Sequence, residues 1–197
     1  MSRRIIGLTG GIATGKSTVS RFLADTYHIP IIDADLLARD AVSYGSPILK
    51  QISLRYDNSI LLPDGTLNRK KLGEIIFSQP NEKTWLENQI HPYVRHQIQS
   101  ILDETNELII VIVIPLLFEA KMTDLVTEIW VIYCSYDEQI KRLVERDRIS
   151  SDQAIIRIQN QWPIEEKMAL ADVILENSST SEQLFKQIEQ YYLKPPK

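Results

Sequence analysis

The sequence Ile5-Ile-Gly-Leu-Thr-Gly-Gly-Ile-Ala-Thr-Gly-Lys-Ser-Thr18 decides the fold that we expect for this chain. Its first residues are a short apolar run, which predicts a buried strand. The run continues into Gly10–Ser17, which fits the phosphate-loop pattern of Gly, four residues, Gly-Lys-Ser/Thr. Val19, Phe22 and Leu23 follow at helical spacing. Strand, glycine-rich loop and helix in this order are typical of a nucleotide-binding loop; the alternative is a glycine-rich turn that ends in a lysine.

Each part of this phosphate loop, residues 10–17, would have a chemical role in binding a nucleotide. The curled backbone would turn its N–H groups toward the phosphates, and the helix N-terminus would add the positive end of its dipole. Lys16 is expected to reach the β- and γ-phosphates, and the Ser17 hydroxyl is expected to bind Mg²⁺. The residues expected to contact the nucleotide are Gly11, Ala13, Thr14, Gly15, Lys16, Ser17 and Thr18.

Composition narrows the classes of protein to which the chain can belong. Its 197 residues include 44% hydrophobic and 24% charged residues, which is ordinary for a globular protein that buries a core. The net charge of -4 argues against a broad nucleic-acid-binding surface. The single cysteine, Cys134, excludes an intramolecular disulfide and suits a reducing compartment. With no apparent signal peptide and no apolar run long enough to cross a membrane, we expect a cytoplasmic protein.

The apolar runs predict a doubly wound α/β fold with a five-stranded parallel sheet, of the kind found in nucleoside-monophosphate kinases. The runs are residues 5–8, 29–32, 108–114, 128–134 and 172–175. Two intervening segments are longer than a simple crossover needs, and in small kinases such inserts bind the acceptor and form a lid. These two segments are residues 36–105 and about 148–170. Pro92 should begin a helix separate from residues 80–88.

Asp33 and Asp35 follow the second predicted strand and lie two residues apart. If the chain stays extended there, both carboxylates point to one side. Phosphoryl transfer to an alcohol needs a carboxylate that accepts the hydroxyl proton or orients the hydroxyl, and Asp33 is the candidate. Its alternative role is to cap a helix that begins at Leu36. Asp35 is the better-placed cap, and water-mediated contact with Mg²⁺ is its other possible role.

Further polar residues have both a functional and a structural interpretation. Arg142 and Arg146 share one helix face and could neutralise phosphate oxygens, although neighbouring acids also suit surface ion pairs. His91 could cap the helix beginning at Pro92 or touch a ligand. Asn177 could bind an adenine edge or simply form a turn. Lys167, which follows two glutamates, is expected to be a surface charge.

Two missing motifs argue against other nucleotide-binding classes. The sequence contains no Asn-Lys-x-Asp tetrad, which a GTPase would use to recognise guanine. The third predicted strand runs into Pro115 instead of ending in an aspartate, which argues against a conventional ATPase motor.

Beyond the phosphate loop, the chain resembles the dephospho-coenzyme A kinase family over nearly its whole length. The matching elements are Gly7–Thr18, Asp33-Ala34-Asp35 with Ala38-Arg39, His91-Pro92, Pro115-Leu116-Leu117-Phe118-Glu119, Arg142-Leu143 with Arg146-Asp147, Gln161 with Pro163 and Glu165-Glu166-Lys167, and Ala171-Asp172 leading to Asn177. The resemblance implies ATP-dependent phosphorylation of the ribose 3′-hydroxyl of dephospho-coenzyme A, the last step of coenzyme A synthesis. One departure is Ala13-Thr14, where the family often has Gly-Ser or another small pair.

The resemblance also implies a nucleotide-binding core (1–35, 106–139 and 169–197), a helical acceptor domain (36–105) and a lid (140–168). It further implies roles for individual residues. Asp33 would be the base, Arg142 a lid contact to the ATP phosphates, and Asn177 a neighbour of adenine. The residues implied to face dephospho-coenzyme A are Asp35, Arg39, His91, Leu116, Phe118 and Glu119. A nucleoside or nucleoside-monophosphate kinase and a non-catalytic nucleotide-binding module remain the alternatives. We expect a monomer that binds neither nucleic acid nor membrane.

Overall fold

The computed structural model describes residues 3–194 of the chain. It divides into two compact units, one built from the residues up to 33 and from 106 onward, the other from Ala34–Thr105. Each unit has its own buried core. No helix within residues 3–194 combines the length and the apolar character needed to cross a bilayer.

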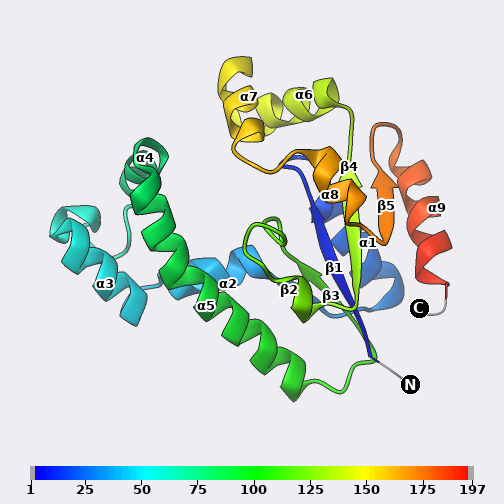
Figure 1. The fold of residues 1–197 in the computed structure, drawn as a ribbon, viewed down its shortest axis with the longest axis horizontal. Coiled ribbons are helices and arrows are strands. Elements are labelled where there is room, and N and C mark those ends of the chain that lie inside the picture. Colours follow the sequence, from blue (N-terminus) through cyan, green and yellow to red (C-terminus); the bar gives the residue numbers. More distant parts are fainter. Residues whose placement is uncertain (1–2, 195–197) are drawn as a thin grey trace. The chain divides into compact units, whose positions relative to one another are not determined.

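The first unit contains a five-stranded, fully parallel sheet with the strand order β2-β3-β1-β4-β5 (Figure 1). The strands are β1 (Arg4–Gly10), β2 (Ile31–Asp33), β3 (Ile109–Val113), β4 (Glu128–Tyr133) and β5 (Val173–Glu176). This confirms the predicted parallel sheet. Because β1 lies at the centre, between β3 and β4, the chain leaves β1 at the point where the strand order reverses direction. Ligands of open α/β sheets bind at such a point, beyond the carboxyl ends of the strands.

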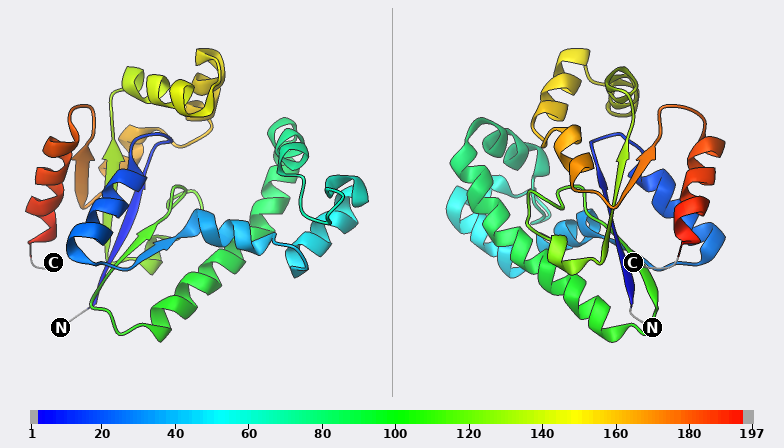
Figure 2. Two further views of the ribbon diagram at one scale, coloured as in Figure 1. Left: turned by 180° about the vertical axis from the view of Figure 1, so that it is seen from behind. Right: turned by 45° about the vertical axis from the view of Figure 1, so that its right-hand side comes forward.

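Helices cover both faces of this sheet. On one face, α1 (Lys16–Tyr27) and α9 (Ser181–Tyr192) lie side by side, and their Phe22 and Phe185 rings stack with centroids 4.2 Å apart (Figures 1 and 2). The core between these helices and the sheet includes Leu8, Val19 and Trp130, all fully buried. On the other face, α8 (Ile164–Ala169) contacts β4. The remaining elements are η2 (Thr123–Leu125), α6 (Tyr136–Asp147) and α7 (Ser151–Gln159).

The second unit is helical and has a separate core. Its elements are α2 (Ala34–Ala41), α3 (Pro47–Tyr56), η1 (Asn58–Ile60), α4 (Arg69–Ser78) and α5 (Pro80–Glu104). Side chains from these elements and from the segments between them form the core: Val42, Leu49, Ile52, Ile60, Leu67, Leu72 and Leu86. A tight turn at residues 62–66 closes on itself through the Leu62 N–H and the Thr66 carbonyl, 2.8 Å apart.

The prediction that Pro92 begins a helix of its own was wrong. Residues 80–104 form one helix of 25 residues with Pro92 inside it. A proline removes one backbone hydrogen bond and crowds the preceding turn, which bends a helix but ends it only where packing does not hold both halves. Here Leu86, before the proline, and Val94 and Ile98, after it, are all buried. Burial of these side chains carries the helix through Pro92.

Candidate active site

The phosphate loop begins where β1 ends and needs glycine at two positions. Gly10, the last residue of β1, has φ 145°, and a Cβ there would lie 2.2 Å from the Ile132 carbonyl oxygen of β4. Gly15 has φ 105°, and a Cβ there would lie 2.1 Å from Asn177 Nδ2. Only glycine combines such backbone angles with such close neighbours. The spacing of the sequence motif is therefore set by the strand beside the loop and by Asn177.

Lys16 is the first residue of α1, and its side chain folds back over the start of the loop. Its Nζ donates to the carbonyl oxygens of Gly10, at 3.0 Å, and of Gly11, at 2.8 Å. The helix has Gly15 as its N-cap, with no capping side chain. A positive dipole end and an ammonium group therefore meet at one place, which is the electrostatic requirement of an anion site.

Three side chains from later parts of the chain hold the loop. Gln139 of α6 donates from Nε2 to the Ile12 carbonyl at 2.7 Å, and the Ile12 N–H donates to Gln161 Oε1 at 2.7 Å. Asn177, after β5, donates from Nδ2 to the Thr14 carbonyl at 2.8 Å. The role of Gln139 was not predicted from the sequence. Gln139 lies four residues before Leu143 and therefore on the same face of α6. This helical spacing is the sequence signal that could have predicted a buried position.

The two candidate arginines of α6 have different surroundings. Arg142 is about three-quarters buried; it donates to the Asn177 carbonyl at 2.8 Å and pairs with Glu138 at 2.9 Å. Arg142 therefore lies beside Asn177, one of the three residues that hold the phosphate loop. Arg146 pairs with Asp147 at 2.8 Å, and this contact raises the pKa of the Arg146 guanidinium. The ion pair of Arg146 with Asp147 fits the structural interpretation given above, in which Arg146 forms a surface ion pair.

Asp33 lies at the same edge of the sheet as the phosphate loop. It is the last residue of β2 and pairs with Val113 of β3, and Val113 pairs on its other side with Leu8 of β1. The three strands run in parallel, so their carboxyl ends meet at this edge. Asp33 is partly buried there. One carboxylate and the phosphate loop therefore flank the end of β3.

The chain does not stay extended from Asp33 to Asp35, so the condition under which both carboxylates would point to one side is not met. Helix α2 begins at Ala34, directly after β2, and not at Leu36. Asp35 is therefore an exposed residue in the first helical turn and not the residue before the helix. An acidic side chain in a first turn is stabilised by the helix dipole, which is a sufficient structural reason for it. The backbone is extended at Asp33 and helical at Asp35. The alternation of an extended chain, which would point both carboxylates to the same side, is therefore absent.

The segment after β3, residues 115–119, is fastened to the sheet and to α8. Thr9 of β1 donates from Oγ1 to the Pro115 carbonyl at 3.2 Å. Leu117 and Phe118 are buried, whereas Leu116 is half-buried. Phe118 stacks on the Trp162 ring with centroids 6.2 Å apart. The Phe118 ring thus has a packing role inside this unit.

Lys167 is fully buried, so the prediction of a surface charge was wrong. Its Nζ lies 2.7 Å from Glu119 Oε1 and donates to the Pro115 carbonyl at 3.3 Å. The Trp162 N–H also donates to Glu119 Oε1, at 3.3 Å. Glu119 Oε2 is buried and has no hydrogen-bond partner among the described residues. Burial of a charge requires a partner of opposite sign, and Glu119 supplies it.

Replacing Lys167 by methionine is expected to destabilise the fold by about 3 kcal/mol, because it leaves the Glu119 carboxylate largely buried without its cation. Urea unfolding of the variant measures this. Adding Glu119→Gln to Lys167→Met should restore much of the lost stability, since the remaining amide carries no charge. A loss below about 1 kcal/mol for the single variant, the size typical of an exposed pair, would contradict this account of the pair.

The other residues expected to face the acceptor lie in the helical unit. Asp35 and Arg39 are exposed on α2, and the Arg39 carbonyl accepts from Arg69 at 3.2 Å. His91 is half-buried near the middle of α5. Burial lowers the pKa of His91, while the nearby Glu87 carboxylate acts in the opposite direction. Burial therefore favours the uncharged imidazole, which can form hydrogen bonds but has no charge to pair with an anion.

The described residues contain no group of three or more histidine, cysteine or acidic side chains that could hold a metal ion by themselves. Ser17 is exposed in the first turn of α1, next to Lys16. A magnesium ion that binds between a nucleotide and a protein usually takes one or two protein oxygens and completes its shell with phosphate and water. The Ser17 hydroxyl fits this requirement.

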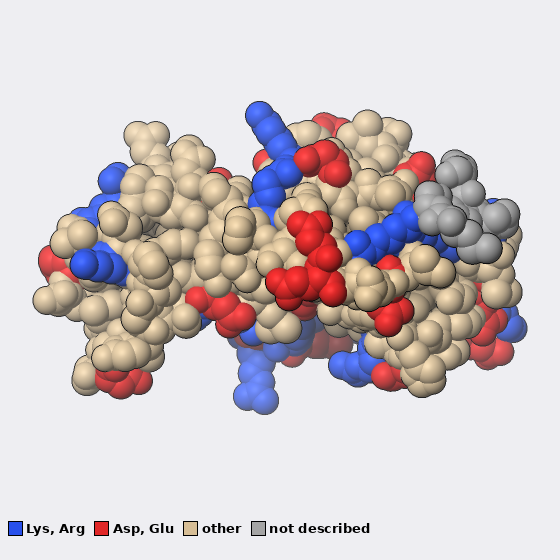
Figure 3. Space-filling view, turned by 90° about the horizontal axis from the view of Figure 1, so that it is seen from below, with Lys and Arg blue, Asp and Glu red and all other residues tan. Residues whose placement is uncertain are grey.

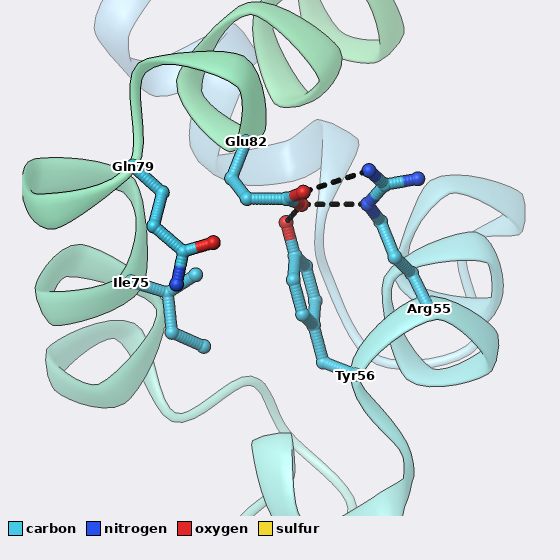
Figure 4. Close-up of a pocket in the computed structure, with 5 residues that line it drawn as sticks. All are labelled: Arg55, Tyr56, Ile75, Gln79 and Glu82. Carbon is cyan, nitrogen blue, oxygen red and sulfur yellow. Dashed lines mark hydrogen bonds and ion pairs between the residues drawn. The ribbon is translucent and has the colours of Figure 1, made fainter.

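A hollow of about 420 Å³ lies within the helical unit, lined by Arg55, Tyr56, Ile75, Gln79 and Glu82 (Figure 4). Glu82 accepts two hydrogen bonds from Arg55, at 2.6 and 2.8 Å, and a third from the Tyr56 hydroxyl. The Arg55 guanidinium also lies over the Trp85 ring, 4.5 Å from its centroid. The polar groups of Arg55 and Glu82 satisfy each other, so this network fastens α3 to α5.

The Glu82 network should make stability depend on pH. The hydrogen bonds from Arg55, followed by that from Tyr56, lower the pKa of Glu82 from 4.5 to about 2. Its stabilising contribution is therefore present above pH 4.5 and is lost as pH falls toward 2. Glu82→Gln should unfold at lower urea concentration than the wild type at pH 7, and the difference should shrink below pH 4.5. A difference that stays constant down to pH 3 would contradict the assignment.

Surface charge is mixed on the face drawn in Figure 3. Basic and acidic side chains form small separate groups there, and neutral residues occupy most of the area between them. No continuous basic surface of the kind that binds a nucleic-acid backbone is visible on this face. This agrees with the net charge of -4.

Comparison with known proteins identifies consistent relatives. The profile of one family, described as dephospho-CoA kinase, matches residues 4–183. A dephospho-CoA kinase of Trichormus variabilis is 57% identical over 189 residues, which cover 96% of each chain. A solved dephospho-CoA kinase of Campylobacter jejuni superposes with a TM-score of 0.68 at 30% identity, covering 95% of this chain and 94% of that one. A solved protein of Thermus thermophilus gives a TM-score of 0.82 at 29% identity, covering 99% and 100%.

Proposed function

The chain belongs to the dephospho-CoA kinase family, and from this premise we propose that it transfers the γ-phosphoryl group of ATP to the ribose 3′-hydroxyl of dephospho-coenzyme A. The observation that carries the proposal is the match of this family over residues 4–183. The position of Asp33 at the same sheet edge as the phosphate loop supports it. Coenzyme A and ADP would be the products.

On the donor side, the phosphate loop binds ATP through its backbone N–H groups and the start of α1. Lys16 exchanges the carbonyl oxygens of Gly10 and Gly11, which it now contacts, for the β- and γ-phosphate oxygens. The Ser17 hydroxyl would hold the Mg²⁺ that accompanies ATP, and this ion would supply positive charge to the phosphates. We assign Arg142, which donates to the Asn177 carbonyl, to the ATP phosphates, and Asn177, which holds the Thr14 carbonyl, to the neighbourhood of adenine. Phosphoryl transfer is accelerated mainly by such positioning and neutralisation of charge.

On the acceptor side, Asp33 hydrogen-bonds to the attacking 3′-hydroxyl and accepts its proton as the bond to phosphorus forms. We assign dephospho-coenzyme A contacts to Asp35, Arg39, His91, Leu116, Phe118 and Glu119. Residues 36–105 would form the acceptor domain and residues 140–168 the lid. Glu119 and Phe118 are already engaged by Lys167 and Trp162, which would present this segment to the acceptor in a fixed conformation. A cytoplasmic location and a monomeric state are part of the proposal.

A coupled assay for ADP formation tests this function. The purified protein with ATP and Mg²⁺ should turn over dephospho-coenzyme A, and AMP, UMP and uridine should give rates near the background. Mass spectrometry of the product should show one added phosphate at the ribose. Turnover of a nucleotide or nucleoside without turnover of dephospho-coenzyme A would overturn the proposal in favour of a different acceptor.

A further inference from the structure

The two peptide groups on either side of Ile12 in the phosphate loop are each held by a glutamine side chain. The Ile12 carbonyl accepts from Gln139 Nε2 and the Ile12 N–H donates to Gln161 Oε1, each at 2.7 Å. The chemistry of the backbone decides the orientation of both amides, because a carbonyl can only accept and an N–H can only donate. Gln139 is 6% exposed and comes from α6, whereas Gln161 follows α7. The two contacts therefore reach the loop from separate parts of the chain.

The residue that follows Ile12 is in a disfavoured conformation. Ala13 has φ 59°, in the left-handed region, where a Cβ crowds the following carbonyl oxygen. A non-glycine residue keeps such a conformation only when its surroundings enforce it. The peptide group that joins the Ile12 carbonyl to the Ala13 nitrogen is directly attached to Ala13, so its hydrogen bond from Gln139 limits the rotation that Ala13 needs to leave the left-handed region. Gln161 fixes the preceding peptide group through the Ile12 N–H. Next along the chain, the Thr14 carbonyl is fixed by Asn177 at 2.8 Å.

We propose that Gln139 and Gln161 are positioning residues for ATP binding, which hold Ala13 in its left-handed conformation and so keep the phosphate loop ready for the nucleotide. A glycine at position 13 would adopt the left-handed conformation without a steric penalty. Alanine does not, and in this arrangement the two glutamines hold it there. The inference rests on the proposed binding of ATP to this loop, and it is independent of the acceptor. ATP affinity measured without acceptor therefore tests it apart from phosphoryl transfer.

The opposite polarity of the two hydrogen bonds gives a matched pair of variants. Gln161→Glu keeps an acceptor for the Ile12 N–H, whereas Gln139→Glu places an acceptor against the Ile12 carbonyl and loses the bond. Both variants add one negative charge beside Ile12, so charge repulsion with the phosphates is similar. Calorimetric titration should show at least a tenfold higher Kd for ATP with Gln139→Glu and a rise of no more than about threefold with Gln161→Glu. Gln159→Ala, at an exposed position on α7, is the control and should bind like wild type.

Rescue by glycine separates loop positioning from general destabilisation. Ala13→Gly, added to Gln139→Glu, should recover at least threefold in affinity relative to Gln139→Glu alone, because glycine adopts positive φ without the steric penalty. Thermal unfolding reports whether each variant is folded. If Gln139→Glu does not fold, Gln161→Ala with and without Ala13→Gly provides the same comparison, with the same tenfold loss and recovery expected.

The outcomes of these titrations are distinct. Equal ATP affinities for Gln139→Glu and Gln161→Glu, or no recovery of affinity when Ala13→Gly is added, would overturn the positioning role. A wild-type protein that binds no ATP would instead overturn the proposed function. A protein that binds ATP, responds as expected to both variants and yet phosphorylates no dephospho-coenzyme A would leave the positioning role standing and remove the acceptor assignment.

Discussion

Asp33→Asn is expected to lower kcat with dephospho-coenzyme A by about a thousandfold, within the range known for loss of a general base. Asparagine is nearly isosteric and still accepts a hydrogen bond, but it cannot take up the hydroxyl proton. Because Asp33 is the last residue of β2, on the far side of β3 from the phosphate loop, ATP affinity should stay within about threefold of the wild type. Steady-state kinetics and calorimetric titration measure the two quantities.

Asp25→Asn provides the matched control for this substitution. Asp25 is exposed on α1, in the same unit as Asp33, and has no place in the proposed mechanism. Its kcat should equal that of the wild type. An Asp33→Asn enzyme that turns over at the wild-type rate would show that another group accepts the proton, or that none is needed.

Lys16→Ala should lower kcat by two to three orders of magnitude, the effect typical of removing one donor that stabilises transition-state charge. The variant removes the ammonium group that now contacts the Gly10 and Gly11 carbonyls and that we assign to the γ-phosphate. ATP affinity should also fall, since the same charge contributes to the bound ground state. Rapid-quench measurement of ADP formation at saturating ATP separates the two effects.

Lys186→Ala serves as the control for charge removal. Lys186 is 71% exposed on α9 and pairs only across one helical turn with Glu182, at 3.2 Å. Rates should be unchanged in this variant, and thermal unfolding should show that both variants are folded. If Lys16→Ala retained the wild-type rate at saturating ATP, the phosphate loop would have no catalytic part in the reaction.

Most of the sheet could be predicted from the sequence, because each strand is a short apolar run bounded by polar or glycine residues. The run at 108–114 has no alternation, as expected for a strand covered on both faces, and it became β3. The phosphate loop could be predicted because its glycines and lysine form a short, recognisable sequence motif, although the neighbours that require Gly10 and Gly15 are the distant residues Ile132 and Asn177. Local patterns were sufficient wherever the structure is decided by neighbours in the chain.

Features decided by distant contacts could not be predicted. Lys167 is buried because it forms an ion pair with Glu119, which lies 48 positions earlier in the chain. Its neighbours in the sequence, Glu165 and Glu166, instead suggested an exposed charged segment. The contacts of Gln139 and Gln161 with Ile12 are made to backbone atoms, which leave no trace in the sequence of the loop. Helix α5 continues through Pro92 because buried side chains on both sides of the proline hold it.

The structure of a complex with dephospho-coenzyme A and a non-hydrolysable ATP analogue tests the central claim most directly. The account predicts that the ribose 3′-oxygen lies within hydrogen-bond distance of an Asp33 carboxylate oxygen, about 2.6–3.2 Å, with the γ-phosphate held by Lys16 on the opposite side of that oxygen. A 3′-oxygen that contacts a different side chain, with Asp33 more than about 6 Å away, beyond the reach of one bridging water, would contradict it.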